Sequence, residues 1–149
     1  PSREPALSPM YDGGVSQPCM GNNMKSAHDL VAAAKQRIEE VPLDRAEQAV
    51  READLVLDVR EPDEYAAGHL PGAVSVPRGL LEFKLSATPA MTPRDLKVVV
   101  YCKSGGRAAL AAASMKDMGY LQVVSLVGGF DGWQSAGYPV VRPEQPAFD

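Results

Sequence analysis

The sequence has few of the features that would place a protein in a specialised class. Only two of its 149 residues are cysteines, and aromatic residues make up 6%. Two cysteines do not make a disulfide framework in a chain of this size, so we expect a reducing compartment. No apolar run reaches the roughly 18 residues that a membrane-spanning helix requires, so no membrane partner is expected.

Positive charge is also scarce. The chain has 15 lysines and arginines against 19 aspartates and glutamates, a formal net charge of −4. General nucleic-acid binding depends on clustered Lys and Arg, so no nucleic-acid partner is expected. An anionic substrate must therefore be attracted by cations close to its binding site and not by the net charge of the protein. The sequence shows no residues at metal-ligand spacing, so we expect neither a metal nor an organic cofactor.

The length suits one domain with a substantial core and is too short for two of ordinary size. We expect a flexible extension over residues 1–23, an N-terminal helix within 24–41, the main domain over 42–141 and a tail over 142–149. The sequence begins at Pro1 rather than Met, which leaves a removed signal peptide open. The expected location is cytoplasmic, with the periplasm as the alternative.

Hydrophobic patterning predicts that helices and strands alternate along the chain. The near-continuous apolar run at 55–59 is typical of a parallel strand that is covered on both faces. Further strands are expected at 73–76, 98–101 and 123–127. Helices are expected at 27–40, with Ser26 as its cap, and at 44–52, 61–68, 79–85, 107–118 and after Gly128. The pattern predicts an α/β domain.

The stretch from Val98 to Ala108 is the most informative part of the chain. A short Val-rich strand is followed by an Ala-rich helix, and the six residues from Cys102 to Arg107 form the turn between them. Glycines in such a turn let successive backbone N–H groups point inward, and the start of the helix adds the positive end of its dipole. We therefore expect an anion-binding loop that begins with Cys102.

A cysteine in this position is expected to be reactive. Helix N-termini and nearby cations lower the pKa of a thiol from about 8.5 to roughly 3.5–7.5, which makes thiolate available as a nucleophile at neutral pH. The alternative, a small buried hydrophobe, explains a lone cysteine but not two glycines and two cations beside it. The expected substrate-binding residues are Lys103, Ser104, Gly105, Gly106, Arg107 and Arg78.

Other polar residues are expected to support this loop rather than to react. Asp58 interrupts an apolar strand and must be paired, either with Arg60 or with the N–H groups of a neighbouring loop, and a pair with Arg60 would brace the active loop. Arg78 follows a strand where open sheets collect ligands, although a solvated arginine fits equally well. His69 is expected to be a hydrogen-bonded structural histidine and Trp133 a core residue. Cys19 is expected to be an idle exposed thiol, with a resolving thiol as the alternative.

Three motifs together resemble the rhodanese domain, a sulfurtransferase family, over roughly residues 41–141. They are residues 58–65 with 68–73, the loop 102–107, and residues 128–133 with 137–139. The resemblance implies a five-stranded parallel sheet with helices on both faces and a persulfide intermediate on Cys102. It also implies a small sulfur-containing anion, such as thiosulfate, as donor and cyanide or a thiol as acceptor.

Two other functions share parts of this pattern. Cys-dependent phosphatases and arsenate reductases place one residue more between Cys and Arg than the four found between Cys102 and Arg107. The shorter loop makes a smaller ring of N–H groups, which suits one sulfur atom better than a tetrahedral phosphate. A non-enzymatic sulfur-carrier or binding module is the other alternative, although inactive relatives usually lose the cysteine that this chain keeps.

Overall fold

The computed structural model describes residues 24–143. A short N-terminal unit ends at Leu30, and a larger unit begins at Val31. In the first unit, Ser26 caps helix α1 (Ala27–Lys35), as predicted. Its Oγ accepts a hydrogen bond from the Asp29 N–H at 3.1 Å, and the Asp29 carboxylate accepts one from the Ser26 N–H at 2.9 Å. Cys19 and the predicted extension over 1–23 lie outside the described residues.

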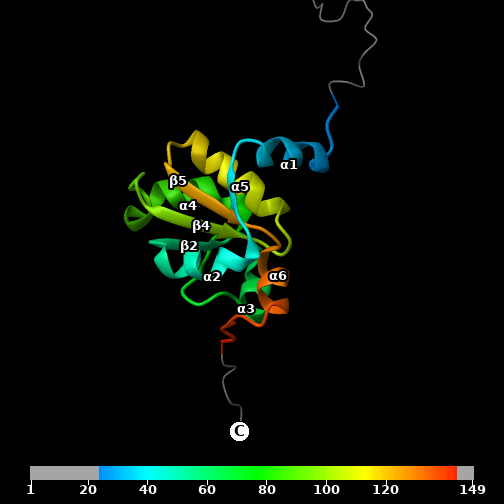
Figure 1. Cartoon of the computed structure of the whole chain (residues 1–149). Helices are drawn as coiled ribbons and strands as arrows, with labels where there is room; N and C mark the ends of the chain where they lie inside the picture. Colours follow the sequence, from blue (N-terminus) through cyan, green and yellow to red (C-terminus); the bar gives the residue numbers. More distant parts are fainter. Residues whose placement is uncertain (1–23, 144–149) are drawn as a thin grey trace, which may run out of the picture. The chain divides into compact units, whose positions relative to one another are not determined.

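The larger unit is built on a five-stranded sheet in the order β1-β5-β4-β2-β3 (Figure 1). All neighbouring strands are parallel, which confirms the predicted fold class. The strands are β1 (Glu39–Val41), β2 (Leu55–Asp58), β3 (Val74–Ser75), β4 (Lys97–Tyr101) and β5 (Gln122–Leu126). Valine and leucine fill the central strands because these positions are covered on both faces of the sheet.

The first strand corrects the prediction for residues 27–40. Helix α1 ends at Lys35, and residues 39–41 form β1, which pairs with β5 so that Val41 lies beside Leu126. Apolar residues at helical spacing continue through Ile38 to Val41, so the local pattern alone favoured a longer helix. Pairing with β5 supplies backbone hydrogen bonds that a lone sequence segment cannot reveal. The sheet therefore begins at Glu39, inside the segment that was predicted to be helical.

Helices cover both faces of the sheet, and each face has its own core. On one face pack α4 (Leu81–Ala87) and α5 (Gly106–Asp117), with Val98 and Val100 of β4 beneath them. On the other pack α2 (Leu43–Glu52) and α6 (Gly129–Ser135), over Val99 and Tyr101. This alternation along β4 follows from the two-residue period of a strand. The remaining elements are α3 (Pro62–Ala67) and the short helices η2 (Arg78–Leu80) and η3 (Pro89–Met91).

The elements of the fold place one loop at the carboxyl end of the sheet. Strand β4 ends at Tyr101, Cys102 follows it, and α5 begins at Gly106. The small residues of α5 allow close approach to the sheet, since Ala108, Ala111 and Ala112 are fully buried. Among residues 24–143, every helix is too short or too polar to cross a membrane.

Candidate active site

Cys102 lies at the bottom of a loop that donates hydrogen bonds to its sulfur. The side chain is 1% exposed. Its Sγ accepts the N–H of Gly105 at 3.1 Å and the N–H of Ala108 at 3.4 Å. Gly105 has φ +136°, a conformation that side-chain-bearing residues rarely adopt, which explains the glycine at this turn. Two backbone N–H groups, those of Gly105 and Ala108, therefore point at the sulfur.

Further donors of the same loop are available to a bound group. Among the described residues, the N–H groups of Ser104, Gly106 and Arg107 donate no hydrogen bond to a protein acceptor. Gly106 and Arg107 form the first turn of α5, where unpaired N–H groups and the helix dipole favour negative charge. The loop can therefore stabilise a second, negatively charged sulfur atom attached to Cys102.

The two cations of the loop are each paired with a carboxylate. Lys103 Nζ lies 2.9 Å from Asp131 Oδ2 on α6. Arg107 donates to both oxygens of Glu64 on α3, at 2.8 and 3.3 Å. We expected both side chains to attract the sulfur donor, and the structure instead directs each of them towards a counter-charge within the protein. Their role in donor binding stays a prediction.

Glu64 is a residue that the sequence did not single out for the site. The hydrogen bond from Arg107 lowers the pKa of Glu64 to about 2, with burial opposing this shift and the Glu61 N–H supporting it. The hydrogen bond to Glu64 likewise raises the pKa of Arg107, although burial opposes this shift. Both groups are therefore charged at neutral pH. Glu64 also accepts the Glu61 N–H at 2.9 Å, which caps α3.

Helix α6 holds the loop through backbone contacts. The N–H of Phe130 donates to the Cys102 carbonyl at 2.7 Å, and the N–H of Asp131 donates to the Lys103 carbonyl at 3.0 Å. Gly129 has φ +56°, and a Cβ at this position would lie 2.5 Å from the Cys102 carbonyl oxygen. No side chain fits there, so Gly129 is required for the close approach. In the sequence it was visible only as part of a family motif.

A buried ion pair lies next to the loop. Asp58 and Arg60, predicted as partners, are 0% and 4% exposed, and Arg60 Nη2 lies 2.7 Å from Asp58 Oδ2. The Tyr101 hydroxyl donates to the same carboxylate at 2.7 Å and accepts the Leu70 N–H at 3.1 Å. The guanidinium also donates to the Gly68 carbonyl at 2.7 Å. The pairing is confirmed, and we call these side chains, Asp58, Arg60 and Tyr101, the buried brace.

The buried brace connects to the loop on two sides. Tyr101 directly precedes Cys102, and the Arg60 guanidinium lies 4.3 Å from the ring centre of Phe130, whose N–H binds the Cys102 carbonyl. Burial works to lower the pKa of Arg60, but the hydrogen bonds and charge of Asp58 outweigh it and raise this pKa. Burial and the Asp58 charge raise the pKa of Tyr101. The buried brace therefore consists of a charged Asp58–Arg60 pair and a neutral Tyr101 hydroxyl.

The other residues considered in the sequence have structural contacts. Arg78 of η2 pairs with Glu82 through Nη1 at 2.9 Å, and its role as an anion contact stays a prediction. His69 stacks on the Tyr65 ring at 3.8 Å, and its Nδ1 lies 3.0 Å from the Tyr65 carbonyl oxygen, which confirms a structural histidine. Trp133 is 1% exposed, as expected of a core residue.

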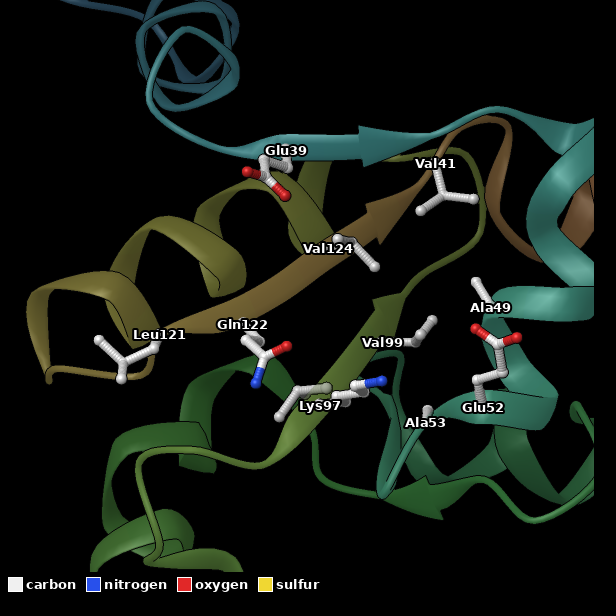
Figure 2. A pocket seen from close by; sticks show the side chains of 11 residues that line it. Glu39, Val41, Ala49, Glu52, Ala53, Lys97, Val99, Leu121, Gln122 and Val124 are labelled. Atoms are coloured by element: carbon white, nitrogen blue, oxygen red, sulfur yellow. The ribbon is translucent and has the colours of Figure 1, made fainter.

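A separate pocket of about 420 Å³ lies at the amino ends of the strands (Figure 2). Its floor includes Val99 and Val124, and Glu39, Glu52 and Lys97 stand around it. Cys102 follows the opposite end of β4, so this pocket is distinct from the cysteine loop. In the part of the chain that the structure describes, no group of three or more His, Cys, Asp and Glu side chains could hold a metal ion.

The fold and the loop agree with one protein family. The model of the rhodanese-like domain family matches residues 39–136, so the chain belongs to this family. The match begins at Glu39, the first residue of β1.

Known relatives point in the same direction. A sulfurtransferase of Allochromatium vinosum is 39% identical over 90 residues, which is 60% of this chain and 80% of the relative. A thiosulfate sulfurtransferase of Pseudomonas fluorescens is 33% identical over 100 residues, covering 66% of this chain and 86% of the relative. A solved structure from Rhodopseudomonas palustris, described as a protein of unknown function and possible tyrosine phosphatase, is 31% identical with a TM-score of 0.72. It covers 86% of this chain and 100% of its own. Family and relatives support a sulfurtransferase activity in general.

Proposed function

We propose that this protein transfers a sulfane sulfur from thiosulfate or a related donor to a thiol or cyanide through a persulfide on Cys102. The observation that carries the proposal is the position of the Cys102 sulfur, within hydrogen-bond distance of the Gly105 and Ala108 N–H groups. Further N–H groups of the loop have no protein acceptor among the described residues. This arrangement favours a thiolate and, after the first step, a persulfide anion.

In the first step the Cys102 thiolate attacks the outer sulfur of the donor. A new S–S bond forms to Cys102 while the S–S bond of thiosulfate breaks, and sulfite leaves with the electron pair of that bond. Loop N–H groups stabilise the negative charge on the outer sulfur of the persulfide. In the second step the acceptor attacks this sulfur. With cyanide, thiocyanate leaves and the Cys102 thiolate is restored, so no external oxidant or reductant is needed.

A phosphatase is the main alternative, because one structural relative is described as a possible tyrosine phosphatase. The four residues between Cys102 and Arg107 favour sulfur transfer, since the shorter loop surrounds a smaller group. Arg107, which would bind phosphate in that mechanism, is instead held by Glu64. Hydrolysis of a phosphotyrosine mimic that disappears in Cys102→Ala would support the phosphatase.

The direct test is the mass of the intact protein after incubation with thiosulfate. We expect a gain of one sulfur atom that cyanide removes and that is absent in Cys102→Ser. Absence of the gain in the wild-type protein would overturn thiosulfate as donor. Multiple turnover with cyanide, followed as thiocyanate release, then separates an enzyme from a sulfur carrier, which would be loaded once without catalytic release.

A further inference from the structure

Three cations lie at the cysteine loop, and they differ in how closely a carboxylate approaches each of them. Lys103 and Arg107 each have a carboxylate oxygen at 2.8–2.9 Å, as described above. The carboxylates offset the charge of both side chains and occupy part of their N–H donors, so an anionic donor must share them. A cation that donates no hydrogen bond to a carboxylate has all its N–H groups available for the donor.

Lys35 is the third cation. Its Nζ lies 3.9 Å from the position that a Cβ of Gly105 would occupy, and the Gly105 N–H is a donor to the Cys102 sulfur. Lys35 Nζ forms a long ion pair with Glu40, whose Oε2 is 3.9 Å away and thus beyond hydrogen-bond distance. The Lys35 side chain is 43% exposed, so its ammonium group is open to solvent and to a ligand.

Packing holds the second half of α1 against α5. Ala34 is 5% exposed and belongs to one apolar cluster with Ala109 and Ala113 of α5, with Val31 and Leu110 at its edge. Lys35 follows Ala34 directly, so its backbone is fixed beside the first turns of α5. Packing therefore fixes the point from which the Lys35 side chain extends towards Gly105.

We propose that Lys35, which lies outside the region matched by the family model, binds the anionic end of the sulfur donor. In the case of thiosulfate this end is the sulfonate group, which becomes sulfite. The outer sulfur then faces Cys102 while the charge is held by the ammonium group beside Gly105. This inference rests on the proposed sulfur transfer, since it assigns a binding group to the donor of that reaction.

The test compares three variants of the full chain in thiosulfate:cyanide sulfurtransferase kinetics. Lys35→Met keeps the length of the side chain and removes its charge, Lys35→Arg keeps the charge, and Lys97→Met removes a lysine at the opposite end of β4. We expect Lys35→Met to raise the KM for thiosulfate about tenfold, as expected for loss of one charge-assisted contact. The kcat and the KM for cyanide should change less than twofold.

The controls distinguish donor binding from a general effect. Lys35→Arg should restore most of the KM, and Lys97→Met, with the same change in net charge, should leave it unchanged. An unchanged thiosulfate KM in Lys35→Met, or equal changes in Lys35→Met and Lys97→Met, would overturn the role of Lys35. Failure of the proposed function would appear differently, as absence of the one-sulfur mass gain in the wild-type protein. Thermal unfolding of each variant shows whether a KM change follows from a loss of structure, which would also count against donor binding.

Discussion

Two kinds of ion pair surround the cysteine loop, and they differ in how much water reaches them. In the buried brace, the side chains of Asp58 and Arg60 are 0% and 5% exposed and share hydrogen bonds with Tyr101 and Gly68. The pairs Lys103–Asp131 and Arg107–Glu64, which we call the rim pairs, are more exposed. The side chains of Lys103 and Asp131 are 60% and 51% exposed. Buried charges that lose their partner destabilise a fold strongly, whereas exposed pairs contribute little. Loss of a partner should therefore cost more stability in the buried brace than in the exposed Lys103–Asp131 pair.

Removal of the buried carboxylate should have the largest effect. In Asp58→Ala, Arg60 keeps its charge in a dry environment without its partner, so we expect the free energy of unfolding to fall by about 3–5 kcal/mol. Chemical denaturation measures this change. Asp131→Ala is the matched control at the rim. A loss below about 1 kcal/mol in Asp58→Ala would mean that water reaches the buried brace.

The contact between α6 and the loop should be next in size. In Gly129→Ala the added Cβ would meet the Cys102 carbonyl oxygen at 2.5 Å, and φ +56° adds strain. We expect a loss of about 1–3 kcal/mol in stability and a fall in sulfur transfer, because the loop must move. Gly72→Ala separates the two causes, since Gly72 has φ +77° but nothing within 4 Å of the Cβ position. Equal activity losses in both variants would contradict the role of the close contact.

The Glu64–Arg107 pair should have a smaller effect that depends on pH. The folded-state pKa of Glu64, about 2, lies below its ordinary value of 4.5. Ionised Glu64 therefore stabilises the fold above about pH 4.5, and this contribution is lost as the pH falls towards 2. With both side chains partly exposed, we expect a difference of about 1 kcal/mol between wild type and Glu64→Gln at pH 7. Unfolding free energies measured from pH 7 to 3 should converge, and a difference that is independent of pH would contradict the ion pair.

The smallest effect is expected at the Lys103–Asp131 pair. Because both side chains are largely exposed, Asp131→Asn should change stability by less than about 1 kcal/mol. It should nevertheless lower the KM for thiosulfate, since the freed Lys103 adds positive charge beside the loop. The decrease should disappear at high salt, which screens exposed charges. An unchanged KM at low salt would show that Lys103 does not face the donor.

The sequence predicted the fold class and the position of the cysteine loop better than the bounds of α1 and the carboxylates that pair with Lys103 and Arg107. The loop between β4 and α5 was predictable because a Val-rich strand, a Gly-rich turn and an Ala-rich helix follow each other directly. The pairing of Asp58 with Arg60 was predictable because the two residues are close in sequence and the strand around Asp58 is apolar. Strand β1 was missed because its three residues owe their conformation to pairing with β5. The sequence around β1 does not indicate that it pairs with β5.

The carboxylates at the rim were missed for a similar reason. Glu64 lies 43 positions from Arg107, and Asp131 lies 28 positions from Lys103. Both acids occupy the first turn of a helix, where acidic residues are common because they complement the helix dipole. Nothing in their local sequence distinguishes this ordinary role from pairing with a distant cation.

The sequence by itself determined the reactive centre, because the nucleophile and the backbone groups that surround it come from one continuous stretch, Cys102 to Ala108. Only the tertiary structure decided the charge around that centre. Parallel strands bring their carboxyl ends to one edge of the sheet, so side chains from α3 and α6, which follow β2 and β5, meet the loop there. Lys35 comes near the loop because the end of α1 packs on α5. Coulombic interactions depend on distance in space, and that distance exists only in the folded protein.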